Sequence, residues 1–88
     1  AGDSPVATAK AELLQNAQDQ EDGLGHLGKL RDWCDQIEED LVRIMEGTGQ
    51  SDLAENIQVI RQQRQHAEDS MPLLQQSADQ TRDMAARL

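Results

Sequence analysis

Apolar residues recur every three or four positions along most of the chain, which is the spacing of one face of an α-helix. One such stripe runs through the stretch LGKLRDWCDQIEEDLVRI, and its members are Leu27, Leu30, Cys34, Ile37, Leu41 and Ile44. A second stripe follows Ser51 and continues to the chain end in steps of four and three residues. Its apolar members are Leu53, Ile57, Ile60, Ala67, Met71, Leu74, Ala78, Ala85 and Leu88, and Arg64 and Thr81 interrupt it. A repeat of 3.5 residues keeps one seam facing a partner helix, so the pattern predicts antiparallel helices with heptad packing.

Local signals give the boundaries of these helices. Ser4 followed by Pro5 is typical of a helix start, with the serine as N-cap and the proline in the first turn. The segment GTGQS, residues 47–51, reads as a helix stop followed by a start, with Ser51 as the next N-cap. Pro72 lies inside the second stripe without shifting it, which favours a kink over a chain reversal.

The segment GLGHLG, residues 23–28, leaves two architectures open. Three glycines coincide there, and the apolar frame slips, because Leu24, Leu27 and Leu30 are three residues apart in succession. If residues 5–46 form one interrupted helix, the chain is a long hairpin. If the chain folds back at the glycines, helices at about 5–22, 26–46 and 51–88 form a small three-helix bundle. In both cases residues 1–88 form one all-α domain, and we expect residues 23–28 to be less helical than their flanks.

Some apolar residues lie outside the predicted seam. They are Trp33, Val42, Met45, Val59, Leu73 and Met84. Large aliphatic side chains in a two-helix seam contribute at most about 2 kcal/mol each, so a lone hairpin is marginally stable. We therefore predict that the first stripe packs on residues 53–74 and that the six off-seam residues contact a third helix. That helix is either another subunit or the chain's own first segment, acting through Val6, Leu13, Leu14 and Ala17.

Composition and charge narrow the possible partners. The chain has 88 residues, no Phe or Tyr, one Trp, and a net charge of −9 from 17 acidic and 8 basic side chains. Binding to phosphate backbones or anionic membranes depends on clustered Lys and Arg, so neither nucleic acid nor an anionic membrane is an expected partner. No apolar run approaches the roughly 20 residues of a membrane span, and the segment AGDSPVATAK lacks the apolar core of a signal peptide. We expect a soluble protein, cytoplasmic or secreted.

The residues capable of chemistry form no recognisable catalytic or metal motif. His26, Cys34 and His66 lack the paired spacing on which metal sites in helical bundles depend. The single Cys34 has no internal disulfide partner, and its place in an apolar stripe favours burial. The acidic runs DQED and EED fit a solvated helix face, and GLGHLG lacks the context of a dinucleotide-binding loop. We therefore predict no enzyme activity, no cofactor and no metal.

The sequence thus favours a non-catalytic module for protein association, which self-associates or pairs with a helical partner. In length and layout, though not in its residues, the chain also resembles the WXG100 family of small secreted helical hairpins, which pair into four-helix dimers. The Trp-x-Gly of that family marks its turn, whereas the turn here reads GTGQ and Trp33 lies well before it. The resemblance implies an alternative function as a secreted effector or carrier. A weaker alternative is an acidic decoy that occupies a nucleic-acid-binding protein.

Overall fold

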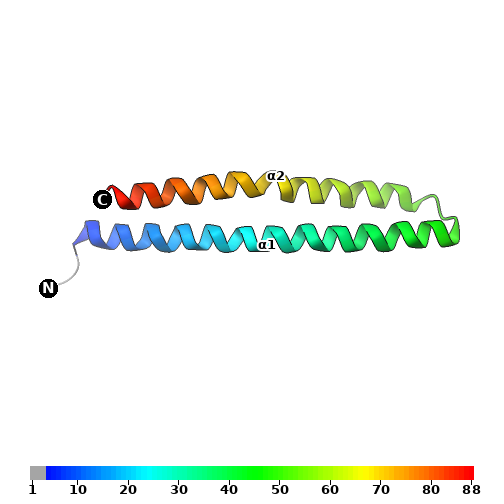
Figure 1. Cartoon of the computed structure of the whole chain (residues 1–88), viewed down its shortest axis with the longest axis horizontal. Coiled ribbons are helices and arrows are strands. Elements are labelled where there is room, and N and C mark those ends of the chain that lie inside the picture. The colour runs from blue at the N-terminus through cyan, green and yellow to red at the C-terminus, as the bar shows by residue number, and fades with distance from the viewer. Residues whose placement is uncertain (1–3) are drawn as a thin grey trace.

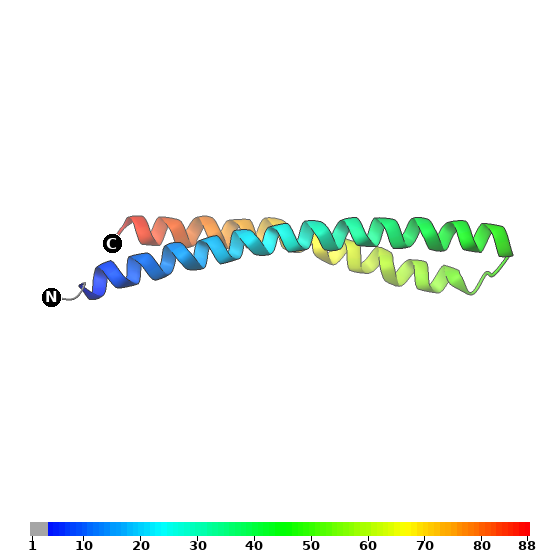
Figure 2. The ribbon, with the colours of Figure 1, turned by 90° about the horizontal axis from the view of Figure 1, so that it is seen from below.

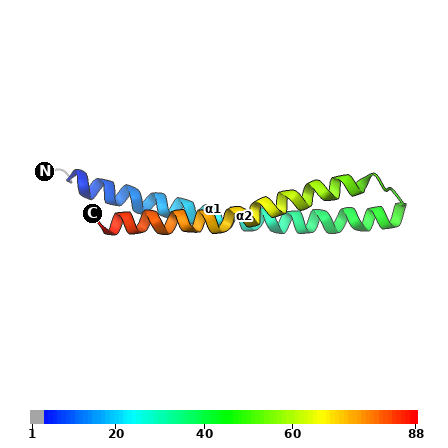
Figure 3. The same cartoon turned by 90° about the horizontal axis from the view of Figure 1, so that it is seen from above.

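The computed structural model describes residues 4–88 and consists of two long helices joined by a tight turn (Figure 1). Helix α1 spans Pro5–Thr48 and helix α2 spans Leu53–Ala86. They lie antiparallel, side by side, in a rod of 71 × 20 × 13 Å. Seen from below and from above (Figures 2 and 3), the two helices cross near their middles. Residues 4–88 contain no strand, so the predicted all-α fold is confirmed in its hairpin form.

Both ends of α1 follow the signals in the sequence. The backbone N–H of Ala7 donates a hydrogen bond of 3.1 Å to the Ser4 hydroxyl, which caps the helix start. At the other end Gly49 adopts φ 70°, and its N–H donates to the carbonyl of Met45 at 2.9 Å. Only glycine takes this left-handed conformation without a steric penalty, and it turns the chain toward α2.

The start of α2 differs from the prediction. Ser51 does not cap it: Ser51 and Asp52 belong to the turn, and the helix begins at Leu53 with no side-chain cap. The backbone N–H groups of Leu53 and Ala54 donate instead to the carbonyls of Gln50 and Ser51, at 3.2 and 3.1 Å. Because these turn bonds satisfy the first donors of α2, the helix can start without a capping side chain.

The glycine segment is helical, which is a correction to the three-helix alternative. Helix α1 runs without interruption through residues 23–28, so the segments 5–22 and 26–46 are one helix and no third helix exists in residues 4–88. Each glycine costs about 1 kcal/mol relative to Ala. Leu24 and Leu27 within the segment are half-buried, and the long helical flanks on either side pack along α2. This packing offsets the glycine cost. Helix α2 likewise continues through Pro72 without a chain reversal.

The residues least exposed on the inner side of the hairpin define the seam between the helices. In α2 these buried or half-buried residues are Leu53, Ile57, Ile60, Arg64, Ala67, Met71, Leu74, Ala78, Thr81 and Ala85. In α1 they are Leu13, Ala17, Gln20, Leu24, Leu27, Arg31, Cys34, Glu38, Leu41 and Met45. The α1 residues also follow one another in steps of four and three, so their frame does not slip at the glycines.

The α1 side of the seam differs from the predicted stripe. Leu30, Ile37 and Ile44 are exposed, and the positions that follow them, Arg31, Glu38 and Met45, lie in the seam instead. Two of these replacements, Arg31 and Glu38, are charged residues and so do not belong to an apolar periodicity. Long side chains can bury their aliphatic stems while the charged ends reach water or a partner.

Candidate interaction surface

Most of the large apolar residues that remain exposed occupy the same position relative to the seam. Seven of these ten residues immediately precede a seam residue in the sequence. They are Leu30, Trp33, Ile37 and Ile44 of α1, and Val59, Leu73 and Met84 of α2. The most exposed are Trp33, at 68%, and Leu73, at 67%. Of the other three, Val6 and Leu88 lie at the open end of the hairpin and Leu14 follows a seam residue.

These seven residues share one broad side of the hairpin, here called the apolar face. Two antiparallel helices are related by an approximate two-fold axis normal to the plane that contains them. A position one residue before the seam therefore lies on the same side of that plane in both helices. Side chains from α1 and α2 thus combine into a single surface rather than two separate stripes.

The apolar face contains a shallow hollow of about 300 Å³. Leu27 lines it from α1, and Leu74 lines it from α2, with both residues in the seam. The remaining lining residues are Ser70, Leu73 and Ser77, which all precede seam residues. Two small serines flank Leu73 at three and four residues, and the hollow lies between the helices at the level of Leu27.

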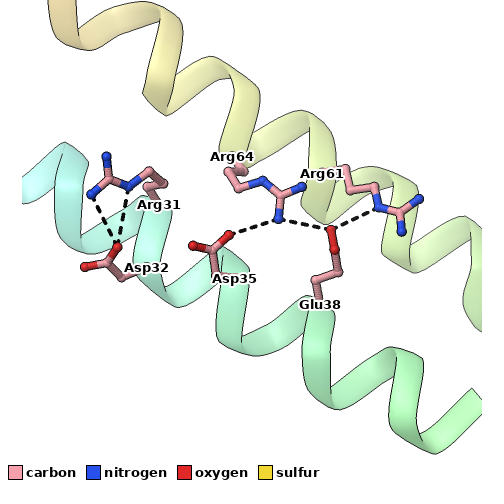
Figure 4. Close-up of polar contacts among 6 residues, drawn as sticks. All are labelled: Arg31, Asp32, Asp35, Glu38, Arg61 and Arg64. Atoms are coloured by element: carbon pink, nitrogen blue, oxygen red, sulfur yellow. Dashed lines mark hydrogen bonds and ion pairs between the residues drawn. The ribbon is translucent and has the colours of Figure 1, made fainter.

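The opposite side of the hairpin carries the ion pairs between the helices (Figure 4). The Arg64 guanidinium lies 3.0 Å from both Asp35 and Glu38, and Glu38 also lies 2.9 Å from Arg61. Nearer the open end, Arg82 pairs with Glu21 at 2.8 Å. All the off-seam members of these pairs directly follow a seam residue, which places them opposite the apolar face. This side is called the charged face.

The ion pairs on the charged face shift two ionisation equilibria. The hydrogen bond from Arg61 lowers the pKa of Glu38 below its ordinary value of 4.5; partial burial opposes this, and the charges of Arg61 and Arg64 reinforce it. Partial burial acts against the charged form of Arg64. The hydrogen bond from Arg64 to Asp35 and the attraction of Glu38 outweigh it, so the pKa of Arg64 is raised. Both shifts favour the charged forms and therefore the pairing of α1 with α2.

The sequence-predicted interface residues divide between these surfaces. Trp33, Val59, Leu73 and Met84 lie on the apolar face, whereas Val42 is half-buried beside the charged face and Met45 is half-buried in the seam. Residues 5–22 continue α1 and do not cover Trp33. The apolar spacing predicts Leu30, Ile37 and Ile44 in the seam, whereas they are exposed on the apolar face. An unbroken four-and-three frame through Arg31 and Glu38 would have placed them outside the seam.

The residues considered for metal or catalytic chemistry do not come together. Among residues 4–88 no three His, Cys, Asp or Glu side chains gather closely enough to hold a metal ion. Cys34 is a free, buried thiol in the seam. A second hollow, of about 420 Å³, is lined by α1 alone, and its residues are Glu21, Asp22, Gly25, His26 and Lys29. Because only one helix forms its walls, it is an open surface groove.

Two further findings bear on function. Neither described helix contains a stretch long and apolar enough to cross a membrane. Comparisons with family models, with curated proteins and with solved structures find no match to this chain.

Proposed function

We propose that the chain is a non-catalytic helical assembly module that pairs through its apolar face, either with itself or with a helical partner. The observation that carries this proposal is the gathering of seven exposed large apolar residues on one face. Such gatherings on small proteins mark interaction surfaces, whereas isolated exposed apolar residues need no explanation. Trp33 lies on this face, and Trp is enriched among residues that dominate binding energy.

The amount of exposed surface supports the same conclusion. A folded monomer of 9.8 kDa has about 5,200 Å² of accessible surface, yet the hairpin exposes 6329 Å². The buried core of residues 4–88 is also thin, since four of its six residues are alanines: Ala17, Ala67, Ala78 and Ala85. A second layer of helices on the apolar face would supply the burial that two helices alone do not provide.

Spacing on the apolar face suits a helical partner. Trp33 follows Leu30 by three residues, Ile37 follows Trp33 by four, and Ile44 follows Ile37 by seven. This is a second heptad pattern on α1, displaced by one residue from the seam. A helix with two such adjacent stripes contacts two neighbouring helices, as in bundles with heptad packing.

The test replaces Trp33 by Glu and measures the particle mass by sedimentation from micromolar to millimolar concentrations. Trp33 is the only tryptophan, so its emission also reports burial of this face. Gln62→Glu adds the same charge at an exposed α2 position away from the seam and serves as the control. We expect the parent and the control to associate with a shift of Trp emission to shorter wavelength, and Trp33→Glu to remain a folded helical monomer.

The self-associating form of the proposal is contradicted if the parent stays monomeric with the emission of hydrated indole at every concentration. It is also contradicted if Trp33→Glu assembles as the parent does.

A further inference from the structure

We propose that the apolar face binds a second copy of this chain in an antiparallel dimer, with α1 of each copy against α1 of the other and Trp33 of each copy level with the hollow of the other. This inference rests on the proposed function and adds the partner and its arrangement. It depends on the relative positions of Trp33, the hollow and the charged residues on the face.

The protruding side chain and the hollow are placed symmetrically about one residue. The hollow is level with Leu27, and Trp33 lies six residues further along α1, which corresponds to about 9 Å. Leu30 lies halfway between them on the same face. A two-fold axis beside Leu30, perpendicular to the rod, superposes Trp33 of one copy on the level of the other copy's hollow. Such self-complementarity is the requirement for a closed two-fold interface.

This axis also passes through the middle of an uncharged segment of the apolar face. The positions that precede seam residues there are Gly23, His26, Leu30, Trp33 and Ile37 in α1, and Gln63, His66, Ser70, Leu73 and Ser77 in α2. None of these ten carries a carboxylate, a Lys or an Arg, although such residues make up 28% of the chain. The first acids beyond them in α1 are Asp19 and Asp40, which lie about 15 Å to either side of Leu30. Two copies of a chain with a net charge of −9 can therefore contact each other here without like charges facing one another at the centre of the interface.

The size of the segment matches that of a stable dimer contact. Between Asp19 and Asp40 the face is about 30 Å long, and the rod is 20 Å wide, which gives a projected area of about 600 Å². The accessible area of a corrugated surface exceeds its projection, and standard interfaces bury about 800 Å² per partner. The Trp33 side chain alone can bury about 150–250 Å².

Cysteine cross-linking tests this arrangement, because a two-fold axis brings equivalent residues together. In a Cys34→Ala background, Leu30→Cys and Ser70→Cys are prepared separately. Residues 30 and 70 are level with each other, since the ion pairs across the hairpin join residues whose numbers add up to about 100, as in Arg64 with Asp35. Both positions lie near the proposed axis, within the separation that a disulfide spans. Gln36→Cys, exposed on the outer side of α1, is the control.

We expect Leu30→Cys and Ser70→Cys each to form a disulfide-linked dimer on the order of tenfold or more faster than Gln36→Cys under mild oxidation, because pairing raises the effective thiol concentration. Circular dichroism checks that every variant keeps its helices. Failure of Leu30→Cys to fold leaves Ser70→Cys as an independent test of the same axis.

The alternative two-fold axis, parallel to the rod, places α1 of one copy against α2 of the other. In that case neither single variant links to itself, and only a mixture of Leu30→Cys and Ser70→Cys gives a mixed dimer. That result, with Trp33 buried in the assembly, would overturn the antiparallel arrangement and leave the proposed function intact. A monomeric chain with hydrated Trp33 would overturn the dimer and the self-associating form of the proposed function.

Discussion

Two isoleucines of the hairpin differ in burial and provide a matched test of the seam. Ile57 of α2 is 3% exposed and is the largest buried side chain, whereas Ile37 of α1 is 42% exposed on the apolar face. Truncation to Ala removes three carbon atoms at either position. At about 0.8 kcal/mol for each buried carbon, the transfer of the Ile57 side chain accounts for about 2.4 kcal/mol, and an unfilled cavity adds to it.

We expect Ile57→Ala to lower the free energy of unfolding by about 2–3 kcal/mol, near the lower end of core truncations, because a two-helix seam can close partly around the gap. Ile37→Ala leaves no enclosed cavity, and little more than half of its side chain is covered. It should cost about 1 kcal/mol in dilute solution. Ile57→Val, which removes one carbon, is expected to lose about 0.5–1.5 kcal/mol and gives an intermediate point.

Urea denaturation followed by circular dichroism measures these differences in the free energy of unfolding. Repeating it at several protein concentrations distinguishes the contribution of the seam from that of the apolar face. The extra loss at Ile57 is expected at the lowest concentration, where the apolar face is unpaired. The loss at Ile37 is expected to grow with concentration as that face pairs. Equal losses at both positions in dilute solution, or a loss below about 0.5 kcal/mol at Ile57, would refute the assignment of the seam.

Three further predictions concern the charged face and the glycine segment. Since the pKa of Glu38 is lowered, its contribution to stability is present above pH 4.5 and is lost as the pH falls through its folded-state pKa; Glu38→Gln should show a shallower loss in acid denaturation than the parent. Gly28→Ala should stabilise the hairpin by about 0.5–1 kcal/mol in thermal melts, because an added Cβ meets nothing within 4 Å. Gly23→Ala should gain less, because its Cβ would lie 3.0 Å from Cδ2 of Leu74. Amide exchange in residues 23–28 should be as slow as in the adjoining turns of α1, and fast exchange there would restore the loop that the sequence suggested.

The helical class and the turn could be predicted because they depend on local signals. The cap at Ser4, the left-handed glycine at residue 49 and the four-and-three spacing after Leu53 each have one dominant physical reading. The choice between hairpin and bundle could not be predicted in the same way. It depends on whether packing along the 44 residues of α1 outweighs the helix-destabilising effect of three glycines. That packing is a tertiary contact with α2, which local sequence signals do not contain.

The candidate surface was predicted in part for a related reason. Trp33 and Leu73 were identified because they fit no seam frame. The apolar periodicity predicts Leu30 and Ile37 in the seam, because the seam residues beside them, Arg31 and Glu38, are charged. What retains Glu38 in the seam is its pairing with Arg61 and Arg64 across the hairpin, which a single helix pattern does not contain.

The charged seam residues also explain why the hairpin has two unlike faces. Ion pairs at partly exposed positions contribute little net stability, so the network around Glu38 and Arg64 does not replace the apolar side chains that are absent from that level of the seam. The network instead fixes the alignment of α1 with α2, because sliding α2 by one turn removes Arg64 from between Asp35 and Glu38. The apolar residues at the same level, Leu30 and Ile37, are thereby free to lie outside the seam. A chain that aligns its two helices with charge on one face can keep apolar surface on the other for assembly, and the stability missing from the hairpin would then be supplied by the partner.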